Sequence, residues 1–94
     1  MAQDRNETFD LVCEASKKIF VVKDAEYDHA TSATGVLGAT VELVGIIARL
    51  KKMVLKSPDN GASKKDELKA ILKDAHNYVN IAMIELADDN WSGK

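Results

Sequence analysis

The sequence predicts an all-α protein, and three observations lead to that fold class. Apolar residues recur at intervals of three and four along most of the chain, which is the period of a helix face. Proline occurs once, and aromatic residues make up 5% of the 94 residues. Strands favour alternating β-branched and aromatic residues, so these features argue against an all-β protein. We expect one domain, residues 1–94, built as an antiparallel bundle of three main helices.

The first helix is expected over about residues 6–22. Asn6 or Thr8 can cap it, because a short polar side chain accepts hydrogen bonds from the free amides of a first turn. Its apolar face carries Phe9, Val12, Cys13, Ser16, Ile19 and Phe20 at helical spacing. The polar segment 23–34 loses that period and is interpreted as a loop with a turn of helix.

The second helix is expected over residues 35–57, and it is apolar on most sides, as a central buried helix would be. Pro58 ends it, because proline disfavours helical geometry at the residue before it. The third helix is expected over residues 63–89, with the Ser63 hydroxyl placed to cap it. A bundle-type seam runs along it at steps of four and three: Leu68, Leu72, Ala75, Val79, Ala82 and Leu86. Residues 90–94 are expected to fray.

Length and composition also bear on assembly, partners and compartment. Two long apolar helices offer more apolar face than 94 residues can cover, so we expect a homo-oligomer, a dimer or larger, that completes a four-helix-like core. The net charge of −2 argues against a nucleic-acid binder. Cys13 is the only cysteine, which excludes an internal disulfide and fits a reducing, cytoplasmic setting. No stretch predicts secretion or membrane insertion.

One stripe of the second predicted helix gathers three of the five glycines around an acid. At helical spacing it carries Gly35, Gly38, Glu42, Gly45, Ile46 and Arg49. Glycine within a helix costs about 0.5–1 kcal/mol relative to alanine, so each one needs a reason. The stripe either lets two helices approach closely or leaves space for a ligand beside Glu42 and Arg49.

Further candidate binding residues are polar groups on the third predicted helix and a run of cations. Glu67, Asp74 and Asn77 share a stripe of this helix, with Tyr78 at its border. These side chains could bind a metal ion or a polar ligand, or they could simply form the solvated side of an amphipathic helix. Residues 43–65 carry six cations against one acid, an excess of five. They either hold phosphates or form the solvated end of a helix.

Three segments together resemble a known family. They are Lys23-Asp24-Ala25-Glu26-Tyr27-Asp28, then Gly35-Val36-Leu37-Gly38 through Ala48-Arg49-Leu50, and Asp74-Ala75-His76-Asn77-Tyr78 through Met83-Ile84-Glu85-Leu86. In this order they resemble small phage and bacterial nucleotide-modification-associated proteins, which belong to the all-α, MazG-like nucleoside triphosphate pyrophosphohydrolases. The resemblance covers about residues 9–86.

The resemblance implies a helical oligomer that cleaves a nucleoside triphosphate, including deoxy forms, between the α- and β-phosphates. Acids would bind Mg²⁺, or Mn²⁺, because such hard cations prefer oxygen ligands. Glu42 and Asp74 match the family's catalytic and metal-binding acids, and Glu67 on the Asp74 stripe can supplement them at the metal. The matching substrate-binding positions are Lys23, Tyr27, Arg49, Lys52, Asn77 and Tyr78.

The chain also departs from the family pattern at the acids. A second acid usually follows one turn after the first on the second helix, and here that position is Gly45. Another usually precedes Asp74 by one turn, where Ala70 and Ile71 stand. These losses keep open an alternative, a non-catalytic phage-type relative that binds a nucleotide or a host protein as a helical oligomer. An unrelated helical adaptor is a third reading.

Overall fold

The computed structural model describes residues 4–26 and 30–93, and every regular element in that part of the chain is helical. This confirms the predicted all-α class. Three α-helices are joined by segments that each contain a short 3₁₀ helix. In chain order the elements are α1 (Arg5–Glu26), η1 (Ala30–Ala33), α2 (Gly35–Leu55), η2 (Ala62–Lys64) and α3 (Lys65–Ala87).

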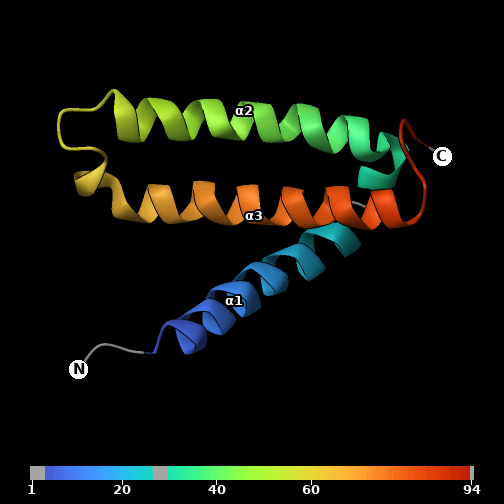
Figure 1. Ribbon diagram of the computed structural model, residues 1–94, viewed down its shortest axis with the longest axis horizontal. Helices are drawn as coiled ribbons and strands as arrows, with labels where there is room; N and C mark the ends of the chain where they lie inside the picture. Colours follow the sequence, from blue (N-terminus) through green and yellow to red (C-terminus); the bar gives the residue numbers. More distant parts are fainter. Residues whose placement is uncertain (1–3, 27–29, 94) are drawn as a thin grey trace.

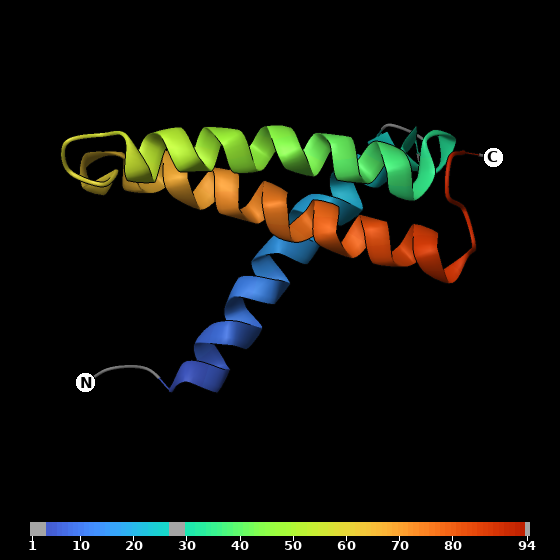
Figure 2. The same cartoon turned by 45° about the horizontal axis from the view of Figure 1, so that its top comes forward.

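The helices α2 and α3 lie antiparallel and side by side, whereas α1 crosses α3 obliquely and its N-terminal half points away from the pair (Figures 1 and 2). The middle position therefore belongs to α3, which contacts both other helices. The prediction of a central, buried second helix is wrong for the single chain. Leu37, Val41 and Val44 on the outer side of α2 are 62–65% exposed.

The ends of α1 differ from the predicted ones, and another side chain caps its start. The Asp4 carboxylate accepts hydrogen bonds from the main-chain amides of Asn6 (2.7 Å) and Glu7 (3.3 Å), so neither Asn6 nor Thr8 caps α1. The helix also continues four residues beyond the predicted end, to Glu26. The predicted loop 23–34 shrinks accordingly, and its expected turn of helix is η1.

The connection between α2 and α3 is held by Ser57 and Asp59. The Ser57 hydroxyl donates to the carbonyl of Met53 (2.6 Å), and the amide of Gly61 donates to the Ser57 hydroxyl (2.8 Å). The Asp59 carboxylate accepts from the amides of Gly61 (3.1 Å) and Ser63 (3.0 Å). Ser63 is thus held by Asp59 and does not cap α3, which begins at Lys65. Likewise α2 ends at Leu55, two residues before the predicted end.

The C-terminal segment is tied to the helix pair through Asn90, so the expectation of a frayed end is wrong for residues 90–93. Asn90 is 4% exposed, and its side-chain amide donates to the carbonyl of Ser32 (2.7 Å) and to the buried Glu85 carboxylate (2.6 Å). Its own carbonyl accepts from the amide of Val36 (2.9 Å). These bonds join the end of α3 to the start of α2 and close that end of the helix pair.

The chain leaves much of its apolar surface uncovered. Among the described residues the buried apolar side chains are Ala39, Ile46 and Ile81. The accessible surface is 7130 Å², whereas a compact monomer of this mass exposes about 5,400 Å². The radius of gyration is 15.0 Å, against about 12 Å for a compact domain of this length. No helix in the described ranges has the length and apolar character needed to cross a bilayer.

Candidate functional site

A cavity of about 490 Å³ lies where the three helices meet. All three contribute to its wall, which is lined by Phe20, Lys23, Asp24, Glu42, Ile46, Arg49, Asp74, Asn77, Tyr78 and Ile81. Six of these residues were singled out from the sequence as candidate site residues: Lys23, Glu42, Arg49, Asp74, Asn77 and Tyr78. The oblique approach of α1 to the antiparallel pair creates this space, because α1 closes one side of the α2–α3 surface without filling it.

The cavity has a buried floor and a charged rim. Ile46, Asn77 and Ile81 are 2%, 8% and 7% exposed and form the floor. Glu42 and Arg49 on α2 and Lys23 on α1 are exposed. A ligand bound here would therefore place an apolar or flat part against the floor and its charged groups at the rim.

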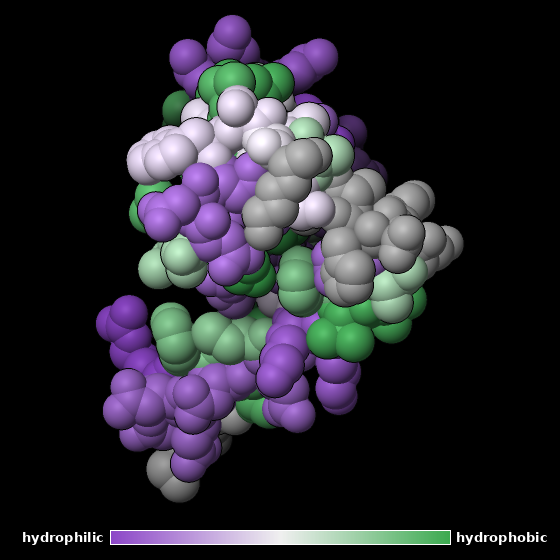
Figure 3. All heavy atoms as spheres, turned by 90° about the vertical axis from the view of Figure 1, so that its right-hand side faces the viewer, coloured by the Kyte–Doolittle hydropathy of each residue, from purple (hydrophilic) through white to green (hydrophobic). Residues whose placement is uncertain are grey.

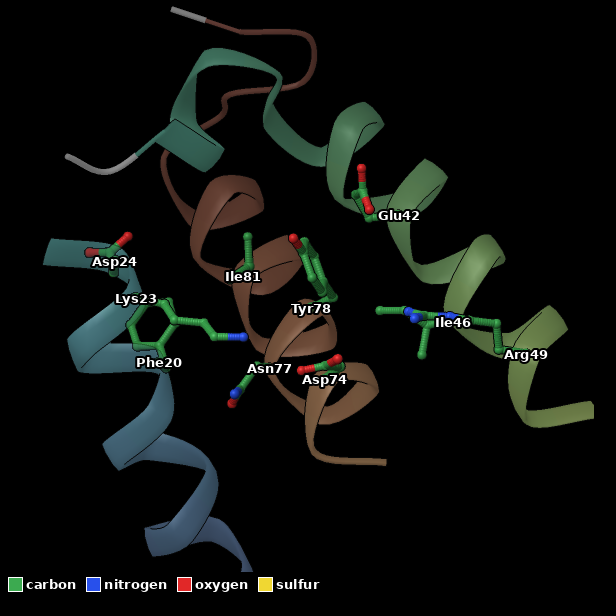
Figure 4. A pocket seen from close by; sticks show the side chains of 10 residues that line it. All are labelled: Phe20, Lys23, Asp24, Glu42, Ile46, Arg49, Asp74, Asn77, Tyr78 and Ile81. Atoms are coloured by element: carbon green, nitrogen blue, oxygen red, sulfur yellow. The ribbon is translucent and has the colours of Figure 1, made fainter. Parts of the chain in front are cut away.

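Two cations enter the cavity from opposite sides. Figure 4 shows Lys23 reaching in from α1 and Arg49 from α2, with Asp74 of α3 between them. Lysine and arginine both donate charge-assisted hydrogen bonds to phosphate oxygens, and arginine can do so through two parallel donors. The spacing of the two cations around the α3 groups therefore suits an extended anion better than a single small ion.

The three acids of the cavity stand on three different helices. Asp24 lies on α1, Glu42 on α2 and Asp74 on α3, and Figure 4 shows the Glu42 and Asp74 carboxylates on either side of Tyr78. Within residues 4–26 and 30–93, no three His, Cys, Asp or Glu side chains form a group that could hold a metal ion. The acids thus do not build a closed metal cage, although each offers the hard oxygen ligands that Mg²⁺ prefers.

Two candidate residues in the described part of the chain do not line the cavity. Lys52 lies one turn beyond Arg49, in the last turn of α2, and Glu67 lies in the first turn of α3; both are exposed to solvent. Tyr27 falls outside the described residues. Lys52, from the run of cations, and Glu67, from the stripe on the third helix, therefore fit the alternative in which these side chains are solvated.

Four residues of the cavity are not among the site residues predicted from the sequence: Phe20, Asp24, Ile46 and Ile81. The predicted first helix carries Phe20 on its apolar face and leaves Asp24 in a loop, and Ile46 lies on the predicted glycine stripe beside Glu42 and Arg49. A helix extended to residue 26 places Phe20, Lys23 and Asp24 on one face, because side chains three and four residues apart are neighbours on a helix. The signal was therefore present, but the early predicted end of the helix concealed it.

The glycine stripe on α2 has two different structural explanations. A Cβ at Gly35 would collide with the main-chain carbonyl of Asn90, and one at Gly38 would collide with the Thr34 side chain. The atoms concerned belong to the C-terminal segment and to Thr34 just before α2, not to a second helix, so the predicted close approach of two helices does not explain either glycine. A Cβ at Gly45 would meet nothing within 4 Å, and Gly45 is exposed, so packing within the chain does not require a glycine there.

No protein-family model matches the chain, and comparison with curated proteins and with solved structures gave no match either. Two cations, three acids, an amide and a phenol surround an apolar floor. That combination can bind a molecule that has both a flat or apolar part and several negative charges.

Proposed function

We propose that the three-helix cavity binds a nucleoside triphosphate, and that the chain is a MazG-like pyrophosphohydrolase that cleaves it to a nucleoside monophosphate and pyrophosphate. One observation carries the proposal: six candidate residues, chosen from three separate segments of the sequence, line a single cavity of about 490 Å³. Cavities of about 300–1,000 Å³ are the usual size for small-molecule sites. We place this activity in the cytoplasm of a bacterial or phage-infected cell, with the chain acting as a homo-oligomer.

Each group at the cavity has a role in binding the substrate. Lys23 and Arg49 hold the phosphates, since they enter from opposite sides and offset negative charge. Phe20 and Tyr78 provide flat faces for the base, above the apolar floor of Ile46 and Ile81. The Asn77 amide is buried and supplies a polar contact of fixed direction.

Hydrolysis adds water to the α-phosphorus, and the bond from that phosphorus to the bridging oxygen breaks, so pyrophosphate leaves. Asp74 lies between the two cations and is placed to accept the proton of the attacking water. Mg²⁺, or Mn²⁺, would offset charge on the phosphates and help activate the water. It is commonly bound by one or two carboxylates together with substrate phosphates, so Asp74, with Glu42, can hold it without a protein cage.

A panel of nucleoside triphosphates and their deoxy forms, incubated with Mg²⁺ or Mn²⁺ and scored by pyrophosphate release, tests this function. We expect Asp74→Asn to lower the rate by about 100-fold or more, and Glu42→Gln to lower it as well. Glu67→Gln is the matched control, because Glu67 lies two turns earlier on the same helix and outside the cavity. Equal rates for Asp74→Asn and Glu67→Gln would contradict the proposed role of Asp74.

The second candidate function is a non-catalytic relative that binds a nucleotide or a host protein. The separation of the three acids on three helices favours it, together with Gly45 and Ala70 at positions where the family carries acids. Gly45→Glu distinguishes the two functions, since the open space at Gly45 accepts a side chain. A large gain in pyrophosphate release would identify an incomplete acid pair as the cause of weak activity. Nucleotide binding without turnover in either form would favour the non-catalytic relative.

A further inference from the structure

The divergence of α1 from α3 leaves a second hollow, separate from the three-helix cavity. This α1–α3 groove has a volume of about 550 Å³, within the range of about 300–1,000 Å³ that is usual for small-molecule sites. It shares no lining residue with the three-helix cavity. Figure 3 shows apolar side chains beside the hollow that separates the lower part of the molecule, formed by α1, from the helices above it.

The groove is narrow at one end and open at the other. Along α1 the exposed fraction falls from 68% at Phe9 and 52% at Val12 to 1% at Ser16. On the facing side of α3, Leu72 is 51% exposed, and His76, one turn later, is half-buried. The reason is that α1 crosses α3 with its C-terminal half, while its N-terminal half points away (Figure 1). The narrow end therefore lies at Ser16 and His76, and the open end lies at Phe9.

Two polar atoms at the narrow end lack a hydrogen-bond partner. The Ser16 hydroxyl oxygen and the His76 Nδ1 are buried and make no hydrogen bond within the described part of the chain. Both residues line the groove. A buried polar group without a partner destabilises a protein, and no hydrogen bond holds the Ser16 hydroxyl in its rotamer. The hydroxyl is therefore able to turn toward a polar group of a ligand at this end.

The charges of the groove favour an anion. Among the residues that the structure describes, the charged ones that line the groove are Lys69 and Lys73 of α3, and no acid is among them. Lys73 is half-buried and lies one turn before His76, so the two side chains are neighbours on α3. Lys69 is exposed and lies one turn closer to the open end. An anionic head group at the narrow end would therefore meet a cation and no opposing acid.

The groove between its two ends is apolar. Val12 of α1 and Leu72 of α3 line it there, followed by Phe9 at the open end. Covering these exposed side chains with an apolar chain removes them from water, which is favourable. The distance from Ser16 to Phe9 along the helix axis is about 10 Å. A fatty carboxylate of about eight carbons has about this length, given bond lengths of about 1.5 Å.

We propose that the α1–α3 groove binds a medium-chain fatty carboxylate, with its carboxylate at the narrow end and its alkyl chain directed toward the open end. The carboxylate accepts hydrogen bonds from the Ser16 hydroxyl, from His76 in the tautomer that carries its proton on Nδ1, and from the Lys73 ammonium. Hydrogen bonds to an ionised group are stronger than those between neutral groups. The alkyl chain covers Leu72 and Phe9. This inference does not rest on the proposed function, because the two sites share no residue.

Calorimetric titration with octanoate tests both parts of the ligand. We expect saturable binding at one site per chain. Acetate, which has the head group without the chain, should bind at least about tenfold more weakly. Octylammonium, which has the same chain with the opposite charge, should also bind at least about tenfold more weakly. Equal binding of octanoate and octylammonium, or no binding of octanoate, would overturn the proposal.

Replacement of Lys73 tests the position of the carboxylate. We expect Lys73→Ala to weaken octanoate binding by about tenfold, through loss of a charge-assisted hydrogen bond. Lys65→Ala is the matched control, because Lys65 lies two turns earlier on the same helix and outside the groove. It should bind octanoate as the unaltered chain does. Equal affinities for Lys73→Ala and Lys65→Ala would contradict the proposed head-group site.

Ser16→Ala separates a role in binding from a role in folding. Alanine removes the unpaired buried hydroxyl, so without ligand the variant should unfold at a higher temperature than the unaltered chain. Its affinity for octanoate should nevertheless fall by about fivefold or more, because the carboxylate loses a donor. A residue that binds a ligand at the expense of stability shows these opposite effects. Lower stability with unchanged affinity would mean that the hydroxyl serves the fold, and would overturn the proposal.

The three-helix cavity is the other place where octanoate would find cations beside apolar side chains. Arg49→Ala distinguishes the two sites, because Arg49 lines that cavity and not the groove. We expect this variant to bind octanoate as the unaltered chain does, whatever its effect on nucleotide binding. Weaker octanoate binding by Arg49→Ala, with unchanged binding by Lys73→Ala, would place octanoate in the three-helix cavity and overturn the proposal.

Discussion

At the scale of single residues, Gly35 and Gly45 of α2 differ in how closely other atoms surround them. Gly35 adopts a φ of +63°, which L side chains rarely adopt, and a Cβ there would collide with the main chain of Asn90. Gly45 lies within the helix and has open space around it. A glycine is thus required where the C-terminal segment crosses the start of α2, and nothing within the chain requires one at Gly45.

Alanine substitutions at Gly35 and Gly45 should have opposite effects on the stability of the protein. Gly45→Ala should stabilise the protein by about 0.5–1 kcal/mol, because alanine loses less conformational entropy in a helix. Gly35→Ala should destabilise it, because it introduces both strain and a collision. Urea unfolding followed by circular dichroism measures both changes. A destabilising Gly45→Ala variant would mean that the space at Gly45 is filled in solution by a ligand or by another copy.

Candidate site residues could be selected from the sequence only where spacing and residue type agreed. Glu42 and Arg49 stand out as charged groups on the mostly apolar α2, Asp74 and Asn77 share one stripe of α3, and all four line the cavity. Lys52 and Glu67 fit the same patterns but face solvent. Residues one or two turns apart on a helix carry equivalent sequence signals, and only the crossing of α1 decides which of them border the cavity.

At the scale of elements, the connection between α2 and α3 depends on Asp59. Hydrogen bonds from the Ser63 side chain and main chain, with a smaller contribution from Gly61, hold the pKa of the Asp59 carboxyl below its ordinary value. A lowered pKa in the folded state means that folding stabilises the ionised form. The turn that sets the antiparallel course of α3 is therefore more stable when Asp59 is charged.

The pH dependence of unfolding should reflect this carboxylate. Its contribution is fully present above the ordinary aspartate pKa of about 4 and is lost as the pH falls through the lower pKa of the folded state. Asp59→Ala should therefore be less stable than the unaltered chain at pH 7, and the difference should shrink on acidification below about pH 4. Thermal unfolding across this range measures it. A difference independent of pH would show that the charge is not the cause.

The sequence was sufficient to predict that three helices exist, but the residues at which they begin and end could be predicted less well. The period of three and four in apolar residues identified all three helices, although many of these residues, such as Phe9 and Leu72, are exposed in the single chain. The ends depend on hydrogen bonds from residues that the pattern does not distinguish, such as Asp4 at the start of α1 and Asp59 before α3. Asn90 gives no sequence signal for burial, and its role depends on contacts with Ser32 and Glu85, which α3 and η1 bring together.

At the scale of the whole molecule, an open arrangement of helices produces the proposed site. The antiparallel pair of α2 and α3 has little buried core, and α1 crosses it without covering it. The three-helix cavity lies at that crossing. A closely packed three-helix bundle of the same length would have a radius of gyration of about 12 Å in place of 15.0 Å, and it would have filled this space.

The most direct test of the central claim, that the three-helix cavity is a nucleotide site, is calorimetric titration of the intact protein with a deoxynucleoside triphosphate and Mg²⁺. We predict saturable binding that Arg49→Ala weakens by about 10–100-fold, through loss of charge-assisted hydrogen bonds. Lys52→Ala, one turn further along α2 and outside the cavity, should bind as the unaltered chain does. Equal weakening by both variants, or no binding of any nucleotide in the panel, would contradict the account.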